Sequence, residues 1–185
     1  MAPGTLNAAV MPIDQTWEWY EDQRTANRRY RRLLLDALIT GVVVEEKFED
    51  FNSSGIATHF DQQAVELDHL ACFAFISAAE GQLHADYSDR VRQRGRTPLG
   101  RAFRDLKALV SKRKEPRVKL EQDLIEAWKK AFPDHKGIFS DFVGALKYRH
   151  WLAHGRHWNE QVGRRYTPEN VYEIVRKVAD VMASS

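Results

Sequence analysis

The 185-residue sequence has only one cysteine, Cys72, which excludes an internal disulfide and a CxxC metal site. It also lacks an apolar run near the roughly 20 residues that a membrane-spanning helix needs, since the longest run covers only residues 71–79. The N-terminal segment has no basic stretch followed by an apolar block, which is the pattern of a secretory signal. We therefore expect a cytoplasmic protein without a membrane partner, in which Cys72 is a small buried hydrophobic residue.

Net charge is also small, because 28 basic residues are opposed by 26 acidic ones and the formal sum is +2. This mild excess neither requires nor excludes a nucleic-acid partner. Arginines do concentrate in the run RTANRRYRR, residues 24–32. This run either follows a phosphate backbone, with Tyr30 stacking on a base, or forms the solvated face of a helix.

Strand pairs, internal repeats and low-complexity segments are missing, whereas apolar residues recur at helical spacing along most of the chain. We predict a flexible N-terminal tail over residues 1–12 and a single helical domain over residues 13–185. The expected fold is all-α, a compact bundle of about five to six helices. The helices are expected at residues 14–48 with a break near Gly41, 60–94, 99–114, 119–132, 138–158 and 168–182.

Local signals set the expected helix boundaries. Thr97 and Thr167 each precede a proline, so a capping hydroxyl comes just before a residue suited to the first helical position. Residues 52–55, Asn-Ser-Ser-Gly, are expected to form a linker before the long central helix. Gly155 or Gly163 is expected to end the helix that begins near residue 138.

The segment KYRHWLAHGRHW carries residues suited to acid–base chemistry on a phosphodiester. Of the seven histidines, only His154 has an arginine, Arg149, four to six intervening positions upstream. Metal-independent RNA cleavage needs a base for the 2′-hydroxyl proton, an acid for the 5′-oxygen and a cation for the phosphate charge. Histidine can be the acid or the base near neutral pH, and arginine presents two donors to phosphate oxygens. His150 precedes His154 by one helical turn, so we expect it to position RNA or to tune its neighbour.

The match RHWLAH, residues 149–154, resembles the motif of the HEPN superfamily: arginine, a polar residue, then histidine after four to six intervening positions, on a helical bundle. The resemblance implies a homodimer that brings two motifs together and cleaves RNA to 2′,3′-cyclic phosphate and 5′-hydroxyl ends. It further implies a toxin or host-defence effector with an antitoxin or regulatory partner. One subgroup has a tyrosine two residues after the histidine; Arg156 stands there, which argues against regulation through such a tyrosine.

The resemblance also implies that a polar residue from an earlier helix faces the motif, and Glu80 is the candidate, although a solvated glutamate is the alternative. The predicted catalytic residues are therefore Arg149, His154, His150 and Glu80, with no cofactor and no metal. On an ideal helix, Arg149 and His154 point about 140° apart. Either a two-fold dimer brings them to one phosphate, or the helix loosens before Gly155.

Three other interpretations of the segment stay open. Arg149 and His154 could be solvent-facing residues of an amphipathic helix. A stripe at i, i+4 and i+7 could bind zinc or another divalent ion; it consists of His150, His154 and His157. Finally, the chain could be a non-catalytic HEPN-like module for RNA binding or dimerisation, because a fold does not by itself decide function.

Overall fold

The structure, a computed structural model, describes residues 11–42, 45–93, 96–155 and 166–185. Six α-helices and no strand occur in these ranges, which confirms the all-α bundle expected from the sequence. The helices are α1 (Ile13–Thr40), α2 (Ser53–Gln93), α3 (Pro98–Val110), α4 (Glu126–Ala131), α5 (Lys136–Ala153) and α6 (Pro168–Ala183). Short helical turns cover Glu46–Phe48, Leu120–Ile125 and Pro133–His135.

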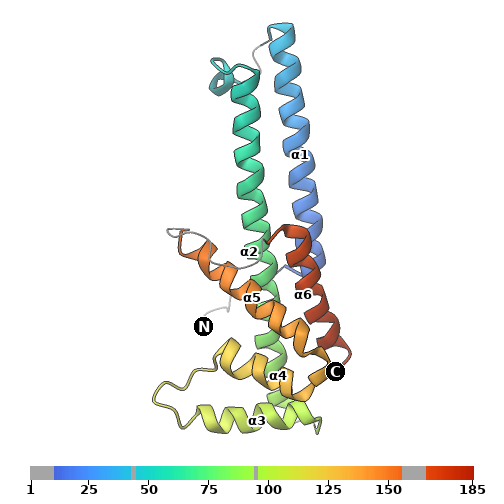
Figure 1. Cartoon of the computed structure of the whole chain (residues 1–185), viewed down its shortest axis with the longest axis vertical. Coiled ribbons are helices and arrows are strands. Elements are labelled where there is room, and N and C mark those ends of the chain that lie inside the picture. Colours follow the sequence, from blue (N-terminus) through green and yellow to red (C-terminus); the bar gives the residue numbers. More distant parts are fainter. Residues whose placement is uncertain (1–10, 43–44, 94–95, 156–165) are drawn as a thin grey trace, which may run out of the picture.

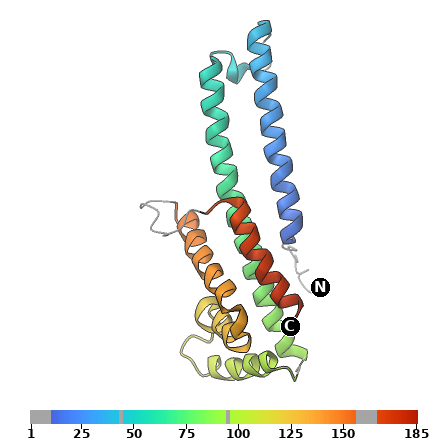
Figure 2. The same ribbon diagram turned by 45° about the vertical axis from the view of Figure 1, so that its right-hand side comes forward.

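Two long antiparallel helices, α1 and α2, set the shape of the molecule. Their distal halves extend well beyond the other four helices, as both views show (Figures 1 and 2). We call this extension, residues 30–42 and 45–60, the arm. It has a small hydrophobic cluster of its own, separate from the main core. The buried members of that cluster are Leu34, Phe48, Ile56 and Phe60.

The second half of α2 is the centre of the main core, as expected for the central helix. Phe75, Ile76 and Leu83 of this helix are fully buried, and α6 and α5 lie beside it (Figure 2). Cys72 is also buried, and burial raises the pKa of its thiol to about 12, so it behaves as the expected hydrophobic residue. At the N-terminal end of α1, the Tyr20 hydroxyl donates a 2.7 Å hydrogen bond to Asp68 of α2.

Most of the predicted helix boundaries are confirmed. The Thr97 hydroxyl accepts a hydrogen bond from the Gly100 N–H, and Thr167 forms a reciprocal capping box with Asn170 at the start of α6. Gly41 has a φ of 69° and ends α1, as the expected break required. Gly155, with a φ of 75°, follows the end of α5.

One predicted boundary is wrong. Residues 53–55 form the first turn of α2 and do not form a linker. The side-chain oxygen of Asn52 accepts a 2.8 Å hydrogen bond from the Gly55 N–H, so Asn52 acts as a helix cap. Serine and glycine suit a loop as well as a capped first turn, and the capping asparagine decides between the two.

The N-terminal tail lies almost wholly outside the described residues, and the assignment of residues 13–185 to one domain stays a prediction. The first helix does begin at Ile13, the residue at which the helical domain was expected to begin. No helix in the described ranges has both the length and the apolar character needed to cross a membrane.

Candidate functional site

The predicted motif lies where α5 ends. His150 is in the last turn of the helix and Arg149 directly precedes it; His154 is the C-terminal cap residue, with a backbone N–H that donates to the His150 carbonyl at 3.1 Å. Gly155, the next residue, has the left-handed backbone conformation that commonly follows the end of a helix. The segment thus leaves helical geometry directly after Ala153, which is where loosening of the helix was expected.

Arg149 is held against α2 by two contacts. Its guanidinium lies 3.7 Å from the Glu80 carboxylate, and about a third of each side chain is exposed, 34% and 29%. The same guanidinium lies over the Phe73 ring, 5.1 Å from the ring centroid. Arg149 is therefore packed against a neighbouring helix and is not a freely solvated residue. The structure brings Glu80 to the motif, where the resemblance placed it.

One donor of the Arg149 side chain has no partner. Its Nε is buried and makes no hydrogen bond to any residue that the structure describes. Buried polar atoms normally have a partner, so this N–H is an exception, and because it is closed to solvent a ligand in the groove does not reach it in this conformation. The side chain as a whole is 34% exposed, so its terminal nitrogens are the donors that can bind an anion while the guanidinium remains next to Glu80.

A groove of about 530 Å³ opens beside this arginine. Its walls come from α2, from the turn at Leu120–Ile125 with the residue before it, and from the last two turns of α5. The lining residues are Glu80, Lys119, Leu120, Glu121, Gln122, Leu146, Lys147, Arg149 and His150. The lining thus has three basic residues, Lys119, Lys147 and Arg149, against two acidic ones, Glu80 and Glu121, with apolar surface from Leu120 and Leu146. This small positive excess, with one carboxylate already paired to Arg149, is compatible with an anionic ligand that has a flat apolar part.

His154 does not line this groove. It is exposed, and its ring lies beside that of His150, with the two centroids 4.1 Å apart. His150 lines the groove and therefore connects the outer histidine to the site of Arg149. Within one chain, the structure groups Arg149, Glu80 and His150, and leaves His154 at the margin.

Among the residues that sequence reasoning missed are Lys119 and Lys147 of the groove lining and Phe73, which packs against Arg149. Lys147 precedes His150 by three positions, so the helical period already places both on one face, and this signal was available. Phe73 lies seven positions before Glu80, which also puts them on one face. Lys119 carries no local signal, because only the packing of its turn against α2 and α5 brings it to the groove.

Two further expectations concern metal binding and the arginine run. The third histidine of the metal stripe, His157, lies outside the described residues, and the described parts of the chain hold no cluster of three or more metal-ligating side chains. The Tyr30 ring packs at steep angles against Phe48 and Phe60, with centroids 5.9 and 5.6 Å away. Tyr30 is therefore part of the hydrophobic packing of the arm, and the alternative that it stacks on a base stays a prediction.

Arginines of the run are partly engaged in the fold. Arg24 binds Glu169 of α6 at 3.1 Å, and Arg31 binds Asp61 of α2 at 2.9 Å. These exposed ion pairs attach α1 to its neighbours and contribute little to stability individually. The run therefore combines fold contacts with a solvated helix face.

Comparison with known proteins gives no further guide to this site. No protein-family model, no curated protein and no solved structure matches the chain. The chemistry of the groove is consequently argued from the contacts of Arg149, Glu80 and His150.

Proposed function

We propose that the chain is a metal-independent endoribonuclease of the HEPN type that acts as a homodimer. The observation that supports this proposal most directly is the half-buried Arg149 guanidinium beside Glu80, at the wall of a groove that also contains two lysines and a histidine. A guanidinium fixed by a carboxylate offers its remaining donors in a set direction, which suits the oxygens of a phosphodiester.

The proposed reaction uses residues of the motif alone. One imidazole takes the proton of the ribose 2′-hydroxyl, and the resulting oxygen attacks the adjacent phosphorus. The bond from phosphorus to the 5′-oxygen breaks, and that oxygen receives a proton from a second, protonated imidazole. The products carry a 2′,3′-cyclic phosphate and a 5′-hydroxyl. Arg149 stabilises the negative charge that builds on the phosphate during attack.

In the proposed homodimer, a second copy of the chain supplies the His154 imidazole that the groove of one copy lacks. His154 lies outside the groove of its own chain, and a two-fold axis near the end of α5 would bring the exposed His154 of each copy toward the other copy's Arg149. In this arrangement His154 is the principal acid or base, and His150 positions the RNA or assists proton transfer through its contact with His154.

The test is cleavage of total RNA by the purified protein in EDTA. We expect the parent to cut and to leave cyclic-phosphate ends, and we expect Arg149→Ala and His154→Ala to be inactive. His135→Ala is the matched control, because this histidine lies at the opposite end of α5. Loss of cleavage in EDTA by the parent would contradict the metal-independent mechanism, and equal activity of all four proteins would contradict the site.

The second candidate function is a non-catalytic RNA-binding or dimerisation module, which the two groove lysines favour independently of His154. RNA binding without cleavage by any variant would support it. For the enzyme, we propose a cytoplasmic toxin or host-defence role under the control of an antitoxin or regulatory protein. Growth arrest on expression, relieved by His154→Ala, is the expected sign of that role.

A further inference from the structure

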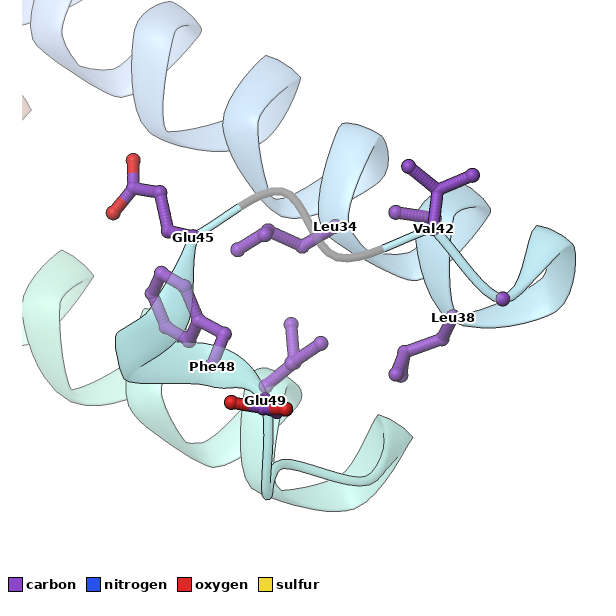
Figure 3. A pocket seen from close by; sticks show the side chains of 9 residues that line it. Leu34, Leu38, Val42, Glu45, Phe48 and Glu49 are labelled. Carbon is purple, nitrogen blue, oxygen red and sulfur yellow. The ribbon is translucent and has the colours of Figure 1, made fainter.

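The tip of the arm contains a second cavity, far from the groove of Arg149. It is small, about 190 Å³, and lies between the C-terminal end of α1, the turn at Glu46–Phe48 and the first turn of α2 (Figure 3). The residues that line it are Leu34, Ala37, Leu38, Gly41, Val42, Glu45, Phe48, Glu49 and Ile56.

The floor and the apolar wall of this cavity continue into exposed surface. Leu34, Phe48 and Ile56 are buried and form the floor, whereas Leu38 and Val42 at the opening are 40% and 61% exposed. The neighbouring Ile39 is 84% exposed. Leu34, Leu38 and Phe48 surround the middle of the pocket in Figure 3. A cavity that opens onto exposed apolar side chains offers hydrophobic contact to another molecule.

The rim of the cavity is acidic. Glu45 and Glu49 line it, and residues 36–50 contain five acidic residues and a single basic one, Lys47. The Lys47 ammonium lies 3.7 Å from Glu45 and over the Phe48 ring, so it neutralises only part of this charge. A negative rim attracts a basic partner and repels the phosphates of a nucleic acid.

The size of the cavity selects the kind of occupant. Pockets for drug-sized ligands hold about 300 Å³ or more, whereas a cavity of about 150 Å³ accepts a benzene ring. A volume of 190 Å³ therefore matches one large apolar side chain. Protein interfaces commonly depend on such an anchor, inserted at the centre and surrounded by a polar rim.

We propose that the arm tip is a docking site for another protein, which inserts one large apolar side chain and places flanking Lys or Arg side chains against Glu45 and Glu49. This proposal is independent of RNA cleavage, because it uses no residue of the groove. The apolar pocket supplies the affinity of the contact, and the acidic rim supplies its preference for a basic segment.

Selection from a random 12-residue peptide display library on the full-length chain tests this proposal. We expect enriched peptides to share a Leu, Met, Phe or Trp flanked by Lys or Arg. A synthetic peptide with the shared sequence is then measured by fluorescence anisotropy against the parent and two tip variants, Glu45→Lys/Glu49→Lys and Leu38→Glu. We expect each variant to bind about tenfold more weakly or worse.

The matched control is Glu18→Lys/Glu21→Lys, which makes the same change in net charge at exposed positions of α1 far from the tip. We expect it to bind the peptide within about twofold of the parent. Circular dichroism checks that all variants keep their helix content, and the double glutamate variant retains the test if Leu38→Glu does not fold.

Three results would overturn the proposal: no enrichment on the parent above that on Glu45→Lys/Glu49→Lys, a shared sequence without basic residues, or an equal loss of affinity in the control. Self-association seen by light scattering and abolished by Leu38→Glu would instead identify a second copy of this chain as the occupant, and would overturn the assignment to another protein.

Discussion

Glu80 and Arg149 form an ion pair that we expect to fix the position of the guanidinium more than to stabilise the fold. Both side chains are about one-third exposed, so solvent screens their attraction. Exposed pairs of this kind contribute roughly 1 kcal/mol or less to the free energy of unfolding. The carboxylate instead restricts where the guanidinium lies, together with the Phe73 ring beneath it.

Replacing Glu80 by Gln should therefore affect catalysis more than folding. We expect the free energy of unfolding to change by less than about 1 kcal/mol. We expect the rate of RNA cleavage to fall about tenfold because the guanidinium loses its anchor, while RNA affinity stays the same or increases. Glu121→Gln is the control, since Glu121 lines the same groove outside the ion pair. Equal effects of the two substitutions on rate would contradict a positioning role for Glu80.

Asp123 is the buried carboxylate whose protonation should control stability at low pH. It is 8% exposed, accepts two 2.7 Å hydrogen bonds from Arg113 and accepts a third from the Lys119 N–H at 2.8 Å. The Arg113 guanidinium lowers the pKa of this carboxyl below its usual value of 3.8. Because the folded pKa is the lower one, the carboxylate stabilises the fold above the unfolded pKa, and this contribution is lost as the pH falls through the folded pKa.

Asp123→Asn should thus destabilise the protein by about 1–3 kcal/mol at pH 7, because Arg113 then lacks its charged acceptor. The difference from the parent should shrink below about pH 4, as the parent's own carboxyl takes up a proton. Urea unfolding at pH 7 and pH 3 measures both values. Asp105→Asn, at an exposed position of α3, should leave stability unchanged at either pH. A constant difference across this range would contradict the linkage.

At the scale of elements, the packing of α5 depends on a glycine. A Cβ at Gly144 would lie 2.5 Å from the Tyr166 hydroxyl and 3.9 Å from the next nearest atom of that ring. Tyr166 stacks on Tyr148 of α5, with ring centroids 4.9 Å apart, directly before α6 begins. Gly144 therefore allows the chain entering α6 to pack closely on α5.

Gly144→Ala should lower the free energy of unfolding by about 1–3 kcal/mol, as overpacking does. Since the close atom is the hydroxyl, the same substitution in a Tyr166→Phe background should cost much less, which a double-mutant cycle of thermal or urea unfolding measures. Gly137→Ala is the control: nothing lies within 4 Å of a Cβ there, and alanine favours the helix. Equal costs in both backgrounds would contradict the steric explanation.

The elements that sequence predicted well are those fixed by local contacts. Thr97, Thr167 and Gly41 act within one turn of their own position, so their roles are evident in the sequence. The linker at residues 52–55 was mispredicted because a capped turn and a loop use the same residue types. The packing of Tyr30 inside the arm depends on Phe48 and Phe60, which no local pattern links to it.

The same distinction applies to the candidate site. Arg149, His150 and His154 belong to one short segment, so their spacing alone identified them. Their relation to Lys119 and Phe73 depends on how α2, α5 and the turn at Leu120–Ile125 pack together. Sequence therefore indicated the groups for which we propose a chemical role, while the surroundings of those groups required the fold.

At the scale of the molecule, charge is unevenly distributed despite a net value of +2. The groove is lined by three basic and two acidic residues, whereas residues 36–50 at the arm tip contain five acidic residues and one basic one. RNA binding is measured with the His154→Ala protein, and then with Lys119→Gln and Lys147→Gln added to it. We expect the two added substitutions to lower the magnitude of the slope of log affinity against log salt concentration by roughly 1.4, because each lost contact with a single-stranded phosphate lowers it by about 0.7. Lys112→Gln with Lys114→Gln is the control pair outside the groove. A slope unchanged by the groove lysines would contradict their contact with RNA.

Subunit mixing tests whether two chains share a site. Arg149→Ala and His154→Ala are unfolded together and refolded at equal concentration, and cleavage is compared with that of each variant alone. If each site takes its arginine from one copy and its histidine from the other, roughly a quarter of the parent activity should return, because half of the dimers are mixed and each has one intact site. No recovery, with mixed dimers demonstrated by a tagged subunit, would place both groups within one chain.

The unbroken length of α2 has a consequence for control of the molecule. Ile56 at the tip cavity and Glu80 at the groove lie on this one helix, 24 positions apart, which corresponds to about 36 Å along its axis. For a partner that contacts the arm tip alone, as we propose, this separation places the contact away from the groove. We expect such a partner to tether the molecule without covering Arg149.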